Sequence, residues 1–139
     1  MPPHSPLPAP TGLEHELGFE HVELSGDRVV LRWEVTSRHH QPYGIVHGGV
    51  YCAAIESAAS IGAALWFGER GKVVGAANHT NFLRAVSTGL LTATATPVHR
   101  GRSQQLWSVD VTDEDGRLVA RGEVRLQNLT PDAPAAVSG

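Results

Sequence analysis

Residues 49–67 read GVYCAAIESAASIGAALWF, and they are the most informative part of the chain for its architecture. It holds no proline and a single charge, and alanine, serine and glycine supply most of its length. A helix on a protein surface presents a charged face, and this stretch has none. Small side chains also let a helix lie close to other backbones. We therefore expect one long helix that is enclosed by the rest of the fold, with Gly68 and Gly71 ending it.

The residues on both sides of this helix alternate as strands do. In residues 28–35 the apolar Val29, Leu31 and Trp33 share one face, and charged residues take the other. Residues 25–27 and 113–116 are turn signals. The pattern predicts strands over 18–25, 28–35, 72–84, 90–98, 105–111 and 117–126, in the order β-β-α-β-β-β-β. Short turns between the last strands favour antiparallel pairing, so the fold class is α+β.

Length, charge and composition exclude several classes of protein. The chain has 139 residues, enough for one domain, and a net charge of −3, which argues against a dedicated nucleic-acid binder. Its single cysteine, Cys52, rules out an intrachain disulfide. Five of its nine prolines lie in residues 1–10. We expect a disordered tail over 1–11, one domain over 12–128 and a flexible tail over 129–139. No membrane span is expected, and the default location is the cytoplasm.

Glu56 is the main functional clue, because it is the only charge in the predicted helix. Ser60 follows it by four residues and lies on the same side of the helix. Burying a carboxylate without a partner costs several kcal/mol, so such a group is retained mainly where it is paired or does chemistry. The alternative is that this stripe of the helix meets solvent or an arginine of a neighbouring molecule.

The segment that enters the helix, residues 41–49 (QPYGIVHGG), adds a second clue. The free N–H groups at a helix N-terminus favour anions and developing negative charge. Gly48 and Gly49 allow a substrate carbonyl to approach the backbone closely. The alternative interpretation is that the two glycines only permit a tight turn.

Three blocks in order give a resemblance to a known family. They are residues 41–56 (QPYGIVHGGVYCAAIE), residues 78–84 (NHTNFLR), and residues 99–118, which hold HRGRS, Trp107 and DEDGRL. Together they resemble the hotdog-fold acyl-CoA thioesterases, in the PaaI-like branch of the Arthrobacter-type 4-hydroxybenzoyl-CoA and the 1,4-dihydroxy-2-naphthoyl-CoA thioesterases. The likeness covers residues 12–128. It implies a helix wrapped by an antiparallel sheet, in a homodimer joined edge to edge or a homotetramer.

The resemblance also implies roles for the matching residues. Glu56 matches the catalytic carboxylate, which acts as a nucleophile or as a general base for water. The Gly48 N–H matches the donor that polarises the thioester carbonyl, and Gln41 and His47 match supporting polar groups. Ser60 stands where some members have threonine. The family's site takes Gln41, His47 and Gly48 from one subunit and Glu56 and Ser60 from the other.

For the CoA part of the substrate, the resemblance implies contacts from Arg84, Arg102 and Ser103 to the phosphates. Relatives with a basic C-terminal tail have further arginines, which the last ten residues, TPDAPAAVSG, do not supply. The resemblance implies an acyl-CoA substrate, most simply an aromatic one, and no cofactor or metal. The residues agree with this, since no Cys/His cluster has zinc spacing and His39 and His40 would point apart in a strand.

Two classes of function remain open at this point. The first is a hydrolase of acyl-CoA thioesters, and the second is a non-catalytic acyl-CoA or lipid-binding protein on the same fold. A dehydratase is a weaker third possibility, because the His/Asp pair typical of those enzymes is missing. The sequence contains no G-x-S-x-G elbow, which argues against an α/β-hydrolase. Cys52 among alanines is interpreted as a packing residue.

Overall fold

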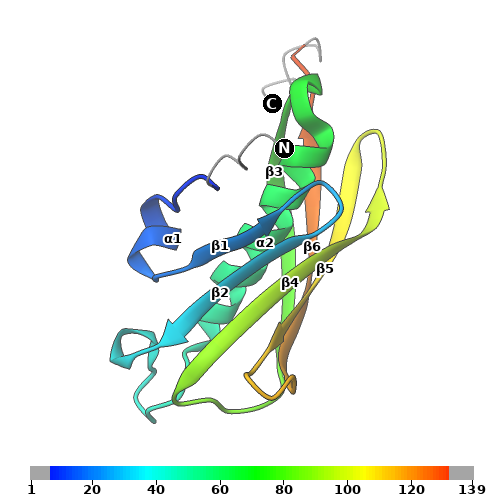
Figure 1. Ribbon diagram of the computed structural model, residues 1–139. Helices are drawn as coiled ribbons and strands as arrows, with labels where there is room; N and C mark the ends of the chain where they lie inside the picture. The colour runs from blue at the N-terminus through cyan, green and yellow to red at the C-terminus, as the bar shows by residue number, and fades with distance from the viewer. Residues whose placement is uncertain (1–6, 132–139) are drawn as a thin grey trace.

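The computed structural model describes residues 7–131 and contains one long helix and six strands (Figure 1). The helical segments are α1 (Gly12–Glu16), α2 (Gly48–Phe67) and two short 3₁₀ turns, η1 (Ser37–His39) and η2 (Gly68–Arg70). The strands are β1 (Glu20–Leu24), β2 (Val29–Val35), β3 (Lys72–Phe82), β4 (Gly89–Arg100), β5 (Gln104–Thr112) and β6 (Leu118–Leu129). This confirms the predicted α+β fold and its order of strands.

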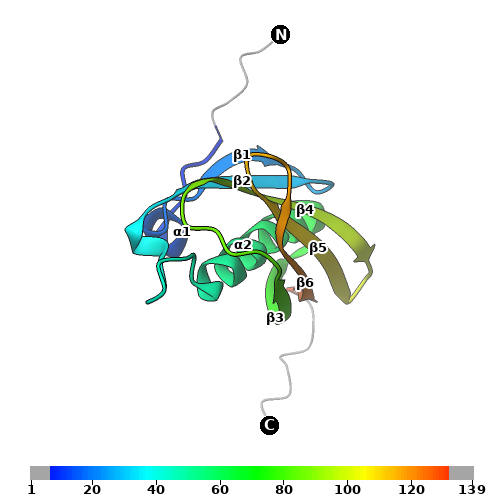
Figure 2. The same ribbon diagram turned by 90° about the horizontal axis from the view of Figure 1, so that it is seen from below.

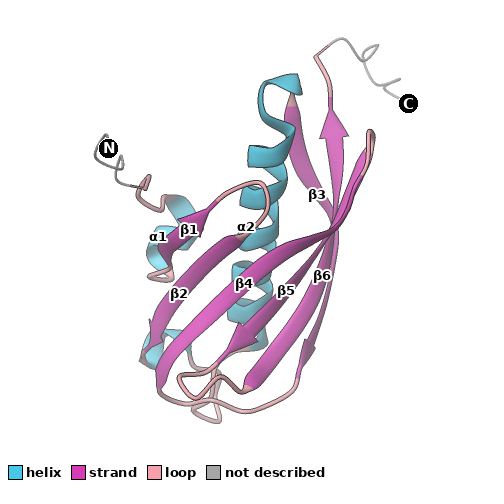
Figure 3. Ribbon diagram, turned by 45° about the vertical axis from the view of Figure 1, so that its right-hand side comes forward, coloured by secondary structure: helices cyan, strands magenta, loops and turns pink. Residues whose placement is uncertain are grey.

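The six strands form one antiparallel sheet in the order β1-β2-β4-β5-β6-β3 (Figure 3). Strands β1 and β2, β4 and β5, and β5 and β6 pair as neighbours in sequence. The other two pairs, β2 with β4 and β3 with β6, join strands that are further apart in sequence. This arrangement arises because the chain leaves the sheet after β2, runs through α2 and returns at the opposite edge as β3. The sheet therefore has a short edge strand, β1, and a long one, β3.

Helix α2 lies along the concave face of the sheet, as Figure 2 shows. The inward side chains of the alternating strands meet alanines of the helix, including Ala54, Ala58 and Ala63, and these are fully buried. Gly62 comes so close to Trp107 that a Cβ there would lie 2.6 Å from the indole ring. Small residues on α2 thus set how near the helix and the sheet can lie.

The expectation that the helix is enclosed on all sides is wrong for one stripe. Gly49, Glu56 and Ala64 are exposed, and Ala53 and Ser60 are only partly buried. The sheet covers the other side of the helix, where Tyr51, Ile55 and Ala59 are buried. Small side chains all round the helix made both sides look alike in the sequence. The helix is long and apolar enough to cross a membrane, but half of its most apolar window is buried inside the fold.

Most predicted boundaries agree with the structure to within three residues. Two differences stand out, at α1 and at η1. Five residues are too few to show helical periodicity, so α1 was not predicted. No element was predicted at His39, which ends η1, where its Nδ1 accepts the Thr36 N–H at 2.9 Å and its Nε2 donates to Leu17 O at 2.7 Å. The expected tails fall largely on residues 1–6 and 132–139, outside the described residues.

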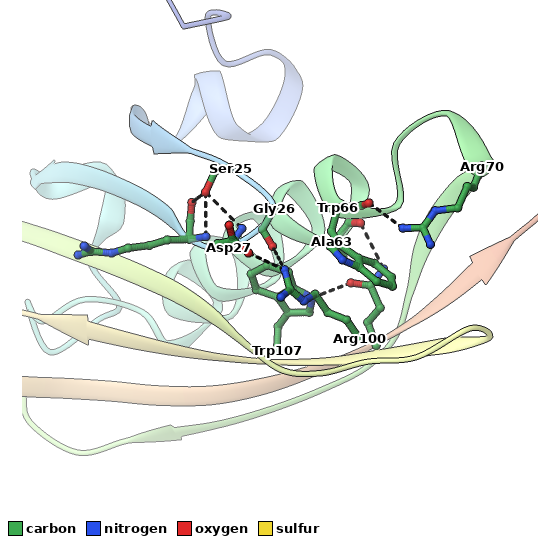
Figure 4. Close-up of polar contacts among 10 residues, drawn as sticks. Ser25, Gly26, Asp27, Ala63, Trp66, Arg70, Arg100 and Trp107 are labelled. Atoms are coloured by element: carbon green, nitrogen blue, oxygen red, sulfur yellow. Dashed lines mark hydrogen bonds and ion pairs between the residues drawn. The ribbon is translucent and has the colours of Figure 1, made fainter.

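A buried polar network fixes the C-terminal half of α2 to the sheet (Figure 4). The Gln105 side chain donates to Ala63 O at 3.2 Å and to Asn128 Oδ1 at 2.9 Å, and its own Oε1 accepts the Trp107 indole N–H at 2.8 Å. Asn128 in turn donates to the carbonyls of Gly101 and Arg102. Because the three bonds of Gln105 are buried and those of Asn128 are partly buried, the network holds the helix, β5 and β6 in one arrangement.

Candidate active site

The loop before α2 is held in place by backbone hydrogen bonds. A tight turn closes it, with Gln41 N–H donating to Ile45 O at 2.8 Å and Gly44 at a φ of 77°, a left-handed value that favours glycine. The Val46 N–H donates to Val86 O at 2.8 Å, which ties the loop to the segment that follows β3. The sequence QPYGIV thus forms a fixed approach to the helix N-terminus.

His47 caps the helix and leaves one backbone donor free. Its Nδ1 accepts the Gly49 N–H at 2.7 Å, and its carbonyl accepts the Val50 N–H at 2.9 Å. The Gly48 N–H has no acceptor among residues 7–131. Unpaired N–H groups at a helix N-terminus are suited to an oxygen that carries partial negative charge. His47 therefore supports this site by organising the first turn.

A cleft of about 320 Å³ opens beside this N–H group. Gln41, Gly48, Tyr51 and Phe82 line it, with residues 83–86 along its rim. The Phe82 ring lies over Gly48, since a Cβ at that position would be 2.6 Å from Phe82 Cζ. Only glycine fits there without moving the ring, so packing against Phe82 accounts for the glycine at position 48. The Gln41 side-chain oxygen accepts the N–H of Tyr43.

Glu56 lies on the exposed stripe of α2, so the expectation that it is buried is wrong for the single chain. Within residues 7–131 its carboxylate has no ion pair or hydrogen bond. It extends over β3, where a Cβ on Gly75 would come within 2.5 Å of Glu56 Oε1. Ser60 is partly buried one turn further along the same stripe. The carboxylate is therefore free to accept a proton or to attack a bound group.

One chain does not bring the two halves of the predicted site together. Gln41, His47 and Gly48 gather at the start of α2, whereas Glu56 follows Gly48 by eight residues. At the helical rise this is about 12 Å along the axis. A thioester carbonyl that accepts the Gly48 N–H is thus out of reach of the Glu56 carboxylate of the same chain.

The residues predicted to contact CoA are also separated. Arg84 lies on the cleft that Gly48 lines, whereas Arg102 follows β4 at the opposite end of the sheet. The length of β4 alone is roughly 36 Å. The Ser103 side chain is exposed next to Arg102, and its carbonyl accepts the Asn128 N–H at 2.9 Å.

Arg102 shares a second cleft, of about 520 Å³, with two further arginines. Arg70 stacks on the Trp66 ring at 4.2 Å and donates to the last carbonyls of α2. The Arg100 guanidinium lies 5.5 Å from the centre of the same Trp66 ring. It also forms an ion pair of 2.8 Å with Asp27, as Figure 4 shows. This end of the molecule therefore carries three arginines, one of them paired with Asp27, beside the rings of Trp66 and Phe67.

Sequence reasoning missed Gly75, and left Tyr51 and Phe82 open as lining or packing residues. A glycine inside a strand pattern often marks the close approach of another group, and this signal was available for Gly75. Nothing in one sequence separates a cleft-lining aromatic residue from a core one. Among residues 7–131 no three His, Cys, Asp or Glu side chains are grouped so as to hold a metal ion.

Comparisons with known proteins identify the family of the chain. Residues 43–120 match the family model described as thioesterase superfamily. The chain is 48% identical to Rv1847 of Mycobacterium tuberculosis over 136 residues, which are 93% of this chain and 97% of the relative. It is 41% identical to 1,4-dihydroxy-2-naphthoyl-CoA hydrolase of Listeria monocytogenes over 108 residues, 78% of this chain and 88% of that one.

Solved structures show the same fold. The crystal structure of S. sahachiroi AziG superposes with a TM-score of 0.85 at 49% identity, covering 86% of this chain and 98% of that chain. Thioesterase HI1161 from Haemophilus influenzae gives a TM-score of 0.82 at 32% identity, covering 88% and 85%. These likenesses decide between the two classes of function in favour of a thioester hydrolase. The chain belongs to the thioesterase superfamily.

Proposed function

We propose that this protein hydrolyses aromatic acyl-CoA thioesters to the free acid and CoA, with Glu56 as the carboxylate that acts on the thioester. The observation that carries the proposal is the state of Glu56, the only charge in α2, which is unpaired within the described residues and lies on the exposed stripe. The aromatic preference is supported by Tyr51 and Phe82 in the cleft beside the free Gly48 N–H.

The carboxylate has two balanced routes. As a general base, Glu56 takes a proton from water, the water oxygen attacks the carbonyl carbon, the C–S bond breaks, and the CoA thiolate recovers the proton. As a nucleophile, a carboxylate oxygen attacks the same carbon and CoA leaves, after which water cleaves the mixed anhydride. In both routes the Gly48 N–H stabilises the oxyanion. After a single turnover in ¹⁸O-water, label in Glu56 would show the second route with water attacking the Glu56 carbonyl carbon, whereas attack on the substrate carbonyl carbon labels only the acid in both routes.

The site is completed by a second copy of the chain. Gly48 and Glu56 of one chain are separated by about 12 Å along the helix, so both cannot act on one carbonyl. In a two-fold dimer every contact between the two chains occurs twice, once from each chain. If two β3 strands pair antiparallel, the helix of one chain runs opposite to that of the other. The Gly48 cleft of one chain then faces the exposed stripe of its partner.

The β3 edge fits this pairing better than the other edge of the sheet. It is 11 residues long, contains no proline, has one lysine at its start, and is exposed along most of its length. Strand β1 has five residues and a register shift between His21 and Glu23. Natural proteins protect edges by shortness, bulges, charge and proline. Strand β3 also has one register shift, between Gly75 and Ala77, but it is more than twice as long as β1 and continues in regular register over residues 77–82.

The same pairing brings together the two ends that bind CoA. The cleft with Arg102 lies near the end of α2, and the cleft with Arg84 lies near its start. Antiparallel partners place the first beside the second of the other chain. We place the CoA phosphates on Arg102 and Ser103, where Arg70 and Arg100 add positive charge.

A substrate panel tests the function. Purified protein is offered benzoyl-, hydroxybenzoyl- and alkanoyl-CoA, and the benzoyl thioester of N-acetylcysteamine, and free thiol is measured with a dye. We expect the highest kcat/KM for aryl-CoA esters, and a raised KM for the N-acetylcysteamine ester, which has no phosphates. A preference for alkanoyl esters would contradict the aromatic class, and equal KM values would contradict the phosphate contacts.

Glu56→Gln tests the role of the carboxylate. The amide keeps the shape but cannot act as base or nucleophile, so kcat should fall by roughly 10²- to 10⁴-fold. The melting temperature should not change, because Glu56 has no partner among the described residues. Glu34→Gln, the same change at an exposed position on the outer side of β2, is the control and should keep full activity. Wild-type turnover by Glu56→Gln would exclude Glu56 as the catalytic group.

A further inference from the structure

Tyr51 is buried with an unpartnered hydroxyl. The residue is 2% exposed, and its hydroxyl oxygen has no hydrogen-bond partner within residues 7–131. Burial raises the pKa of Tyr51 to about 12, so the hydroxyl stays protonated and available as a donor. The indole Nε1 of the neighbouring Trp33 is the other buried side-chain atom without a partner in residues 7–131, whereas the buried His39, Gln105 and Asn128 all have partners. Tyrosine hydroxyls usually find a partner when buried, so this one calls for a reason.

The position of Tyr51 supplies that reason. It follows Gly48 by three residues, about one helical turn, and lines the same cleft of about 320 Å³. Its ring is 6.0 Å from the Phe82 ring, at an interplanar angle of 33°, and 6.3 Å from the Trp33 ring, at 61°. Tyr51 therefore forms the inner wall of the space beside the free N–H group, and Phe82 forms the outer wall.

The outer wall is the more exposed of the two. Phe82 is the last residue of β3 and is 56% exposed, whereas Tyr51 is held between α2 and β2. A planar group that binds beside Gly48 would have to displace the Phe82 ring, and it would then lie against Tyr51. Stacking on aromatic rings favours a planar acyl group, and a donor within the apolar wall favours an oxygen on it.

We propose that Tyr51 is a specificity-determining residue whose hydroxyl donates a hydrogen bond to an oxygen substituent on the ring of an aromatic acyl group. The inference rests on the proposed function and deepens it, because it names which aromatic esters the cleft selects. A site built to pair with a substrate oxygen rejects the analogue that lacks it, since its own polar group is then left unpaired.

The test compares Tyr51→Phe with the wild type on benzoyl-CoA and on the three hydroxybenzoyl-CoA isomers. For the isomer that the wild type prefers, we expect the ratio of its kcat/KM to that of benzoyl-CoA to fall by roughly 3- to 10-fold in the variant, the loss typical of one neutral hydrogen bond. Tyr43→Phe removes a hydroxyl from a side chain that is 91% exposed, and it should leave the ratio unchanged.

Stability gives a second measurement. Tyr51→Phe removes an unpartnered buried hydroxyl, so we expect a melting temperature equal to or above that of the wild type. A lower melting temperature would mean that the hydroxyl already has a partner in the assembled protein, and would overturn the inference. An unchanged ratio with normal aryl-CoA hydrolysis would overturn it too, and would leave the proposed function standing. Failure of the wild type to hydrolyse any aryl-CoA ester would overturn both.

Discussion

The position of the Glu56 carboxylate depends on a glycine of the neighbouring strand. Gly75 offers no side chain, and Glu56 Oε1 occupies the space where a Cβ would stand, 2.5 Å away. The carboxylate is the far end of a flexible side chain, so a methyl group at this position moves it and leaves the backbone in place. Misplacement by about 1 Å at a reacting group can cost on the order of 10²-fold in rate.

We therefore expect Gly75→Ala to lower kcat by roughly 10- to 100-fold without loss of stability. Steady-state hydrolysis and thermal unfolding measure the two effects. In a Glu56→Gln background the added Gly75→Ala should have no further effect on the residual rate, because the group that it displaces is no longer catalytic. Independent losses in the double variant would mean that Gly75 acts through the strand and not through Glu56.

The sequence predicted the position of some site residues but not their burial or their hydrogen bonds. Glu56 and Gly48 were singled out by composition and position, and among residues 7–131 the Glu56 carboxylate and the Gly48 N–H have no hydrogen-bond partner. The expected burial of Glu56 was wrong because the composition of α2 is nearly the same on both sides, so only the tertiary fold decides which stripe the sheet covers. The orphan hydroxyl of Tyr51 could not be predicted, since it depends on which neighbours fail to reach it.

Among the elements, α2 and its contact with β5 show how packing overrides helix propensity. Alanine favours a helix over glycine by about 1 kcal/mol. At Gly62, however, a Cβ would lie 2.6 Å from the Trp107 ring. That ring is fully buried, and its N–H is held by Gln105, which is itself held by Ala63 O and Asn128. Moving the ring would therefore disturb these buried hydrogen bonds.

We expect Gly62→Ala to lower the free energy of unfolding by up to about 2 kcal/mol, because overpacking costs about 1–3 kcal/mol and the gain in helix propensity offsets about 1 kcal/mol of it. Urea unfolding measures this. Ala64→Gly, at an exposed position two residues on, is the control and should be destabilised by propensity alone, about 1 kcal/mol. A more stable Gly62→Ala would mean that Trp107 can be displaced at little cost.

The elements were more predictable than the contacts between them. Alternation predicted β2 and β6, because each has one face on the core and one in solvent. The pairing of β3 with β6 could not be read from alternation, since β3 is exposed on most of its length and has no strong pattern. Likewise the 3₁₀ turn at His39 depends on a bond to Leu17 O, 22 residues earlier.

For the whole molecule, the separation of Gly48 and Glu56 within one chain means that the proposed site needs two chains. If one site takes Gly48 from one subunit and Glu56 from its partner, two different inactive variants can restore each other. Gly48→Val closes the cleft, because even a Cβ there meets the Phe82 ring. Glu56→Gln removes the carboxylate. In a mixed dimer, one site combines both defects and the other site has neither.

Co-expression of the two variants with different affinity tags isolates the mixed dimers, and light scattering confirms their size. With two sites per dimer and one of them intact, we expect about half of the wild-type activity per mixed dimer, and about one quarter in an unsorted equal mixture. Each parent alone should be inactive. If both groups instead served a site within one chain, every site of the mixed dimer would carry one defect, and its activity would be as low as that of the parents.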